Sequence, residues 1–260
     1  MKYNKLAFTL AEVLITLGII GVVAAMTIPN LMSKIQKQIY VTSLKKNYAA
    51  MTQGFKMMLV EDEADDFGGS QYFIGMGKSA CKVPADIDDD KCASLWAGLE
   101  RHLKLTPAVA DKNRAIVRLN NSAYTTTSYV AGSKYLAMPS GMYIIAANFR
   151  KTPGQGKVDK IAELGGHMYT QRATFTVDIN GPANPNKLGR DIFLFQLDDL
   201  GKIYAANSKD VAIYDGQLVG LLYWPGYNRC GNGKSAASIK TSTGEGCAAR
   251  IMERGWIMDY

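Results

Sequence analysis

The apolar residues of the chain are concentrated in one run near its start. Residues 8–28 contain a single charged side chain, Glu12, and the run ends at Pro29. At 1.5 Å per residue, a helix over this run spans about 31 Å, which is close to the thickness of a bilayer core. The pattern therefore predicts a membrane-spanning helix over residues 8–28.

After Pro29 the apolar positions narrow to one face of a helix that continues to about residue 60. The stripe repeats at spacings of four and three and consists of Leu44, Tyr48, Met51, Phe55 and Met58. Such spacing is typical of an amphipathic helix packed on a globular domain. Pro29 lacks a backbone N–H, so we expect it to bend or locally melt the helix.

From residue 61 the pattern predicts a globular domain that extends to residue 260. Acidic residues and glycines end the helix over 61–70, and one short helix is expected around 93–103. Runs rich in β-branched and aromatic residues predict strands over 115–119, 124–130, 142–149, 173–179, 191–196 and 202–204. The fold class expected is α+β, with an antiparallel sheet laid on the helical stripe.

Composition supports a folded, mostly globular chain. Hydrophobic residues make up 47% and charged residues 20%, which is unlike a disordered sequence. The net charge of +7 can favour nucleic acid or anionic surfaces but is modest for 260 residues. Because residues 61–92 are acidic, the rest of the chain is more basic. An acidic and a basic surface on one subunit could serve subunit docking, but an ordinary solvated charge mixture is the simpler interpretation.

Glu12 is unusual because a carboxylate is costly in lipid and calls for a partner. A plain signal anchor has no use for such a charge. An ordinary cleaved signal peptide is disfavoured because helix-forming sequence continues well beyond the apolar run. Lys2 and Lys5 precede that run, so the positive-inside rule places the N-terminus in the cytoplasm and the remaining chain outside it.

Residues 5–15 (KLAFTLAEVLI) resemble the processing and methylation motif of type IV prepilins and type II secretion pseudopilins. The resemblance implies that a membrane peptidase removes leader residues 1–7 by cutting between Ala7 and Phe8 and then methylates the Phe8 amine. Glu12 would compensate that amine during assembly. Pro29 stands where these proteins often kink, and the family fold is lollipop-like. The family usually has Gly where this chain has Ala7.

The resemblance also implies a location and partners. We expect a single-pass protein of the bacterial inner membrane, with its C-terminal domain extracytoplasmic, that assembles into a pilus or a periplasmic pseudopilus. The partners implied are further copies or other pilin-like subunits, prepilin peptidase and the inner-membrane assembly platform. In a filament, the Glu12 carboxylate of one subunit would pair with the Phe8 amine of its neighbour.

The four cysteines form two local pairs, and none lies in a Cys-x-x-Cys motif. In an exported domain they predict the disulfides Cys81–Cys92 and Cys230–Cys247, whereas four free thiols would fit a cytosolic protein. The second pair resembles the C-terminal disulfide-bounded region of type IV pilins, which pseudopilins often lack. Trp256 and Tyr260, in the residues that follow it, are expected to pack rather than bind a ligand.

One polar loop is a candidate metal site. Asp178, Asn180 and Asp191 offer oxygen donors of the kind that calcium takes, although the same segment is rich in ordinary turn signals. We expect no other cofactor. The sequence lacks a nucleophile elbow, a phosphate-binding loop and a His-Glu-x-x-His motif, so no enzymatic role is expected.

Three functions therefore remain open. The first is a structural subunit of a type IV pilus, minor or specialised because the chain is large for a repeating subunit. The second is a pseudopilin of a type II secretion system. The third is a filament-borne adhesin or DNA-uptake subunit that would bind nucleic acid through basic and aromatic side chains. Its candidate residues are Arg114, Arg118, Tyr124 and Tyr129.

Overall fold

The computed structural model describes residues 9–155, 170–205, 211–214, 217–220, 230 and 242–260. The chain divides into two compact units, residues 1–39 and 40–260. Helix α1 (Leu10–Glu61) runs through the boundary between them, and Pro29 lies inside it. The helix is unbroken at Pro29, so no local melting is found there, and the bend stays a prediction.

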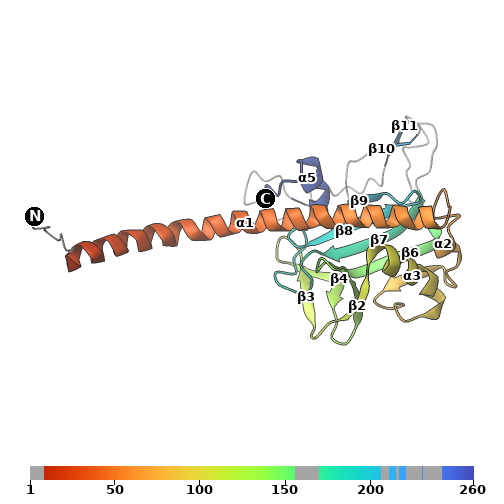
Figure 1. Cartoon of the computed structure of the whole chain (residues 1–260), viewed down its shortest axis with the longest axis horizontal. Helices are drawn as coiled ribbons and strands as arrows, with labels where there is room; N and C mark the ends of the chain where they lie inside the picture. The colour runs from red at the N-terminus through yellow and green to blue at the C-terminus, as the bar shows by residue number, and fades with distance from the viewer. Residues whose placement is uncertain (1–8, 156–169, 206–210, 215–216, 221–229, 231–241) are drawn as a thin grey trace, which may run out of the picture. The chain divides into compact units, whose positions relative to one another are not determined.

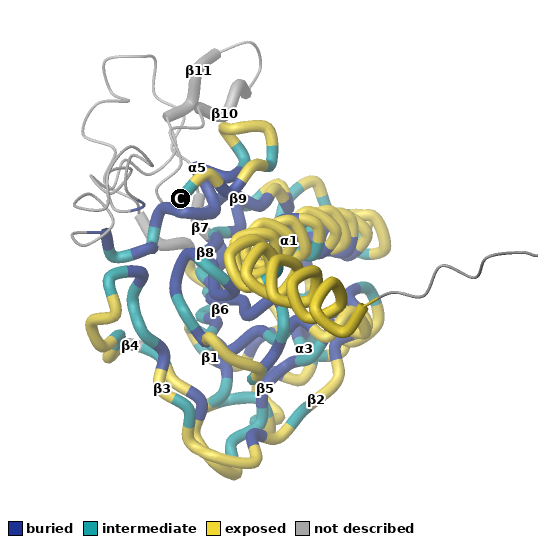
Figure 2. Tube along the Cα trace, turned by 90° about the vertical axis from the view of Figure 1, so that its left-hand side faces the viewer, coloured by how far each residue is buried: buried dark blue, intermediate teal, exposed yellow. Residues whose placement is uncertain are grey.

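The part of α1 in the first unit has its apolar side chains on the outside. Residues 10–39 are exposed almost throughout, as the yellow tube of Figure 2 shows. Leu14, Ile15 and Ile20 each keep more than 60% of their surface accessible. Such a surface is stable only where lipid or other helices cover it.

The second unit is α+β, as predicted. Its main sheet is antiparallel and follows the order β2-β5-β6-β7-β8-β9, with β1 also paired to β6 (Figure 1). The strands of this sheet are β1 (Ala80–Val83), β2 (Thr106–Val109), β5 (Lys134–Ala137), β6 (Tyr143–Gln155), β7 (Thr170–Asp178), β8 (Ile192–Asp198) and β9 (Ile203–Ala205). Two separate hairpins are formed by β3 (Arg114–Val117) with β4 (Ala123–Tyr129) and by β10 (Val211–Tyr214) with β11 (Gln217–Gly220).

The helical stripe packs on this sheet. Met51, Phe55 and Met58 are at most 1% exposed. The Phe55 ring lies 6.2 Å from that of Phe175 on β7, and the half-buried Tyr48 lies 6.1 Å from Phe195 on β8. The 3.6-residue pattern therefore identified the helix face that forms the core.

Helix α3 (Ala93–Leu103) coincides with the short helix expected there. Around it the structure adds α2 (Gln71–Ile74), a 3-10 turn η1 (Asp90–Cys92) and strands β1 and β2, none of which the sequence pattern predicted. The C-terminal helix α5 (Cys247–Glu253) was not predicted either. These elements are short, and short elements carry too little periodicity to be recognised from sequence.

Candidate functional site

Helix α1 begins with a capping box made by Thr9 and Glu12. The Thr9 N–H and hydroxyl both donate to Glu12 Oε2 at 2.9 Å, and the Glu12 N–H donates to Thr9 Oγ1 at 3.3 Å. This reciprocal pair satisfies backbone donors that a helix N-terminus would otherwise leave open. The Thr-x-x-Glu spacing is the sequence signal for it, and the charge of Glu12 alone does not reveal this cap.

The capping box has a consequence for the predicted processing. Ala7 and Phe8 lie outside the described residues, but a cut between them would leave the Thr9 amide intact, so both Thr9 donors would persist in a mature chain. Within the described residues Glu12 Oε1 accepts no hydrogen bond. The carboxylate is thus held in place by one oxygen while the other remains available to a cation.

The helix around Glu12 suits a membrane or a helical bundle. α1 is the one helix among the described residues that is long and apolar enough to cross a bilayer, and its most apolar stretch has a mean hydropathy of 2.2 with none of it buried. A Cβ added at Gly18 or Gly21 would meet no atom within 4 Å. Small residues on an open helix face permit close approach of another helix.

Both disulfides are present. Cys81–Cys92 joins β1 to the turn before α3, and Cys230–Cys247 joins residue 230 to the first residue of α5. All four cysteines are fully buried. The first bridge therefore ties β1 to the start of α3, and the second ties residue 230 to the start of α5.

The C-terminal segment after the second disulfide is fixed by an ion pair between a buried arginine and a partly exposed aspartate. Arg250 on α5 donates to Asp259 through Nε (2.7 Å) and Nη2 (2.8 Å). The Tyr260 hydroxyl donates to the Gly189 carbonyl at 2.7 Å, and Trp256 packs against the core and against Tyr48. Trp256 and Tyr260 thus serve packing.

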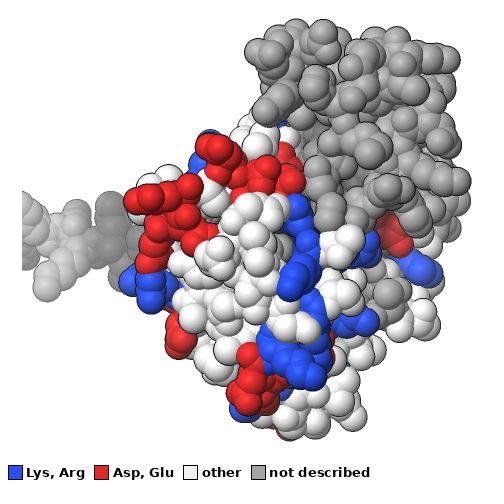
Figure 3. Space-filling model, turned by 90° about the vertical axis from the view of Figure 1, so that its right-hand side faces the viewer, with Lys and Arg blue, Asp and Glu red and all other residues white. Residues whose placement is uncertain are grey.

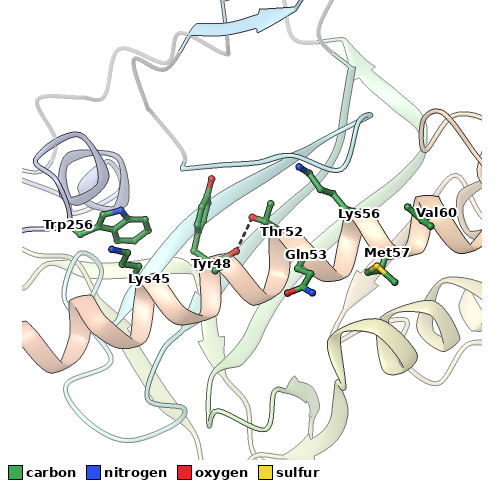
Figure 4. A pocket seen from close by; sticks show the side chains of 9 residues that line it. Lys45, Tyr48, Thr52, Gln53, Lys56, Met57, Val60 and Trp256 are labelled. Atoms are coloured by element: carbon green, nitrogen blue, oxygen red, sulfur yellow. Dashed lines mark hydrogen bonds between the residues drawn. The ribbon is translucent and has the colours of Figure 1, made fainter.

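An apolar groove runs along one face of α1 in the second unit (Figure 4). It measures about 640 Å³. Lys45, Tyr48, Lys56 and Trp256 lie along it, with Lys45 Nζ 5.8 Å from the centre of the Trp256 ring. None of the described residues that line it is acidic.

The structure places the four basic and aromatic side chains considered for nucleic acid in contacts within the chain. Tyr129 is 1% exposed and donates its hydroxyl to Asp178, so it cannot stack on a base, and its proposed role is wrong. Arg114 pairs with Asp111 at 2.8 Å, and the Arg118 guanidinium lies 5.6 Å from the centre of the Tyr124 ring. Three of the four side chains are therefore already engaged with other groups, and the fourth is buried.

On one face of the second unit, acidic and basic side chains lie in separate areas. Figure 3 shows acidic side chains gathered in patches beside a stripe of basic ones. Ion pairs neutralise part of the acidic segment: Lys78 bonds to Asp86 and Asp89, and Lys134 bonds to Asp88. Asp86, Asp88 and Asp89 thus have basic partners from their own chain.

The loop between β7 and β8 brings Asp178, Asn180 and Asp191 together. Asp178 and Asp191 are fully buried. Asp178 accepts from Tyr129 Oη (2.9 Å) and the Asn180 N–H (3.2 Å), and Asp191 accepts from the N–H groups of Asn186 (2.8 Å) and Lys187 (2.7 Å). Burial, followed by the charge of Asp191, raises the pKa of Asp178 to about 8. Burial also raises the pKa of Asp191.

Comparison with known proteins gives one match. Residues 2–28 match the family model described as the prokaryotic N-terminal methylation motif. No curated protein and no solved structure matches the chain.

The match defines the class of the N-terminal segment: it is the prepilin-like signal of type IV pilins and pseudopilins. Combined with the long apolar helix and the sheet domain, the motif supports a pilin-like or pseudopilin subunit that prepilin peptidase processes and that is anchored in a membrane. The match ends before Pro29, so it does not extend to the domain that would distinguish one filament system from another.

Proposed function

We propose that this chain is a minor or specialised subunit of a type IV pilus or a related filament. It would be cut between Ala7 and Phe8, methylated on the Phe8 amine and assembled through α1 with its second unit outside the cytoplasm. The observation that carries this proposal is Glu12, a single carboxylate on an exposed apolar helix and inside a methylation motif.

The role proposed for Glu12 is to set axial register. Cleavage would create a cationic amine at Phe8, and a cation that enters an apolar helix bundle without a partner is far less stable than one paired with a carboxylate. The capping box supports this role because Thr9 fixes one carboxylate oxygen and leaves Oε1 for a neighbouring amine. Pairing would therefore favour one offset between adjacent helices.

The extracytoplasmic location has two supports of its own. Disulfides persist outside the cytoplasm, and both predicted bridges are formed. Lys2 and Lys5 precede the apolar helix and favour a cytoplasmic N-terminus.

The test compares Glu12→Ala with Thr16→Ala. Thr16 lies one turn further along α1, and its hydroxyl donates to the Val13 carbonyl at 3.0 Å, so this control removes a polar group from the same span without removing charge. We expect Glu12→Ala subunits to be processed and membrane-resident but depleted from sheared filaments, and Thr16→Ala subunits to enter them normally. Wild-type incorporation of Glu12→Ala would refute the register role, unless the copy number is very low, which would indicate a tip subunit.

Processing is tested separately by mass spectrometry of the N-terminus. The expected species begins at Phe8 and carries one methyl group. A chain that begins at Met1, or a cut near residues 24–25, would contradict the prepilin assignment.

A pseudopilin of a type II secretion system is the second candidate. The features that favour a pilus are the C-terminal bridge Cys230–Cys247 and the segment packed behind it. Neighbouring genes separate the two: a retraction ATPase indicates a pilus, and secretion-pore genes indicate a pseudopilus. A DNA-uptake role would require an affinity that falls steeply with salt.

A further inference from the structure

The side of α1 that the sheet leaves uncovered forms one wall of the apolar groove in the second unit (Figure 4). Met57 and Val60 lie along this wall with 46% and 68% of their surface exposed. Tyr48 and Trp256 line the groove as well. An exposed apolar surface that is rimmed by polar side chains is typical of a binding site. The groove is therefore a candidate interaction surface.

Trp256 lines the groove in an unusual backbone conformation. Its φ of +65° lies in the left-handed region, which is unfavourable for a bulky side chain. Its N–H donates to the Ile251 carbonyl at 2.8 Å, and its ring, besides packing on the core, lies 5.7 Å from the Tyr48 ring. Strained positions cluster at functional sites, and tryptophan and tyrosine are enriched among the residues that dominate binding energy at protein interfaces. The groove therefore suits a segment of protein.

Two exposed lysines indicate the charge of that segment. Lys45 and Lys56 are 56 − 45 = 11 positions apart, about three helical turns, so both lie on the groove side of α1. The Lys45 ammonium is 5.8 Å from the centre of the Trp256 ring. The described residues of the groove include no carboxylate that could neutralise either lysine. Complementary charges steer association and fix register, so we expect the occupant to carry carboxylates.

The chain itself carries five acids directly after the groove, and they differ in their bonding. Glu61 accepts from a tyrosine hydroxyl, and Asp62 and Asp66 accept from backbone N–H groups of the segment that follows. Glu63 and Asp65 are exposed, and none of the described residues bonds to either carboxylate. Figure 3 views the end of the molecule at which α1 finishes, and acidic patches are visible there. Two carboxylates thus remain available at that end.

We propose that the groove receives the acidic turn, residues 61–66, of a second copy of this chain. Glu63 and Asp65 of one copy face Lys45 and Lys56 of the other. The contact rests on the proposed filament function and adds to it that copies of this chain lie next to one another.

The contact joins two different surfaces, so it is head-to-tail. The groove lies along α1, and the acidic turn follows the end of the same helix. A copy displaced along the helix axis brings its turn to its neighbour's groove and leaves its own groove available to the next copy. Contacts of this kind repeat along a filament instead of closing into a dimer. The surface is small, so it becomes effective once α1 already holds the copies together.

The experiment treats sheared filaments of the full chain with a water-soluble carbodiimide, which joins a carboxylate to an amine in direct contact with it. We expect a product of twice the subunit mass whose digest links Lys45 or Lys56 to Glu63 or Asp65. A wild-type chain absent from the filaments would refute the proposed function and this contact with it. A chain present in filaments that gives no such product, or is linked through other residues or to a different protein, would overturn this contact alone.

Charge reversal assigns the two surfaces. Lys56→Glu should lower the yield of the doubled product by roughly tenfold, because it places like charges together. Lys46→Glu is the matched control: Lys46 is an equally exposed lysine of α1 that does not line this groove, and its reversal should leave the yield unchanged. Equal losses in the two variants would mean that net charge matters rather than the groove, and would overturn the proposal.

The combined variant Lys56→Glu/Glu63→Lys keeps the test decisive if Lys56→Glu alone disturbs the fold. Lys56 and Glu63 are not bonded to each other within the chain, so the exchange restores complementarity only between copies. We expect the doubled product to return to near the wild-type yield and the melting temperature to stay that of the wild type. A combined variant that remains as deficient as Lys56→Glu would overturn the proposal.

Discussion

The ion pair between Arg250 and Asp259 should make a measurable contribution to stability. The Arg250 side chain is 5% exposed and that of Asp259 is 32% exposed. Breaking a fully buried pair costs about 3–5 kcal/mol, because it leaves a buried charge without its partner. An exposed pair contributes about 0.2–1 kcal/mol. Since water reaches Asp259 but hardly reaches Arg250, we expect Asp259→Asn to cost about 2 kcal/mol, between these limits.

In a chain of this size each kcal/mol shifts the melting temperature by about 2–4 °C, so Asp259→Asn should melt about 4–8 °C below the wild type at pH 7. Thermal unfolding followed by circular dichroism measures the shift. Asp88→Asn is the control, because it removes the same charge from the exposed pair with Lys134, whose side chain is 43% exposed. It should cost less than about 0.5 kcal/mol.

The pH dependence gives a second check. The hydrogen bond from Arg250 holds the pKa of Asp259 below its ordinary value. A carboxyl with a lowered folded-state pKa stabilises the fold above its unfolded-state pKa, which is about 3.9, and this contribution is lost as the pH falls through the folded-state pKa. The difference between wild type and Asp259→Asn should therefore persist at pH 5 and shrink below pH 4. If Asp259→Asn and Asp88→Asn have equal effects at pH 7, the reasoning from burial is wrong.

Three further changes test the packing, the first bridge and the helix cap. Gly54→Ala should destabilise the protein by about 1–3 kcal/mol, because the new Cβ would lie 2.2 Å from a Leu103 methyl group. Alanine has the better helix propensity, so an unchanged melting temperature would contradict this close approach. Replacing Cys81 and Cys92 by Ser should cost about 3 kcal/mol, and peptide mapping of the wild type should show no free thiol. Thr9→Ala should speed hydrogen exchange in the first turn of α1, whereas Thr9→Ser should retain the cap and the slow exchange.

The elements predicted from sequence are those whose pattern is set locally. The stripe containing Met51 and Phe55 was recognised because a helix repeats every 3.6 residues, and β8 because apolar and aromatic residues fill a short run. Strand β1 was not predicted, because it is stabilised by pairing with β6, which lies far away in sequence; Cys81 is opposite Phe149. Helix α5 was not predicted, because a disulfide and the Arg250–Asp259 ion pair stabilise it and its own sequence pattern is weak.

The candidate sites also differ in whether local sequence is enough to find them. Glu12 could be found from sequence because one charge in an apolar run needs no knowledge of the fold, and its Thr9 partner is three residues away. The oxygen donors of the β7–β8 loop could be named from sequence, but their burial could not. Tyr129, which bonds to Asp178, is 49 residues away and was assigned to a surface role. Burial is a property of the tertiary fold, so residue types alone cannot provide it.

The two units differ in what stabilises them, and this difference bears on function. Among the described residues of 40–260, most of the large aromatic and aliphatic side chains are buried within the unit. Residues 10–39 bury almost none of theirs, so lipid or other helices must cover this surface. In either environment Glu12 is the one ionisable side chain of the apolar run. Apolar contacts can form at many offsets along a helix, whereas a charge pair forms at only one. The same exposed helix that requires partners therefore carries, in a single carboxylate, the group able to fix where each partner binds.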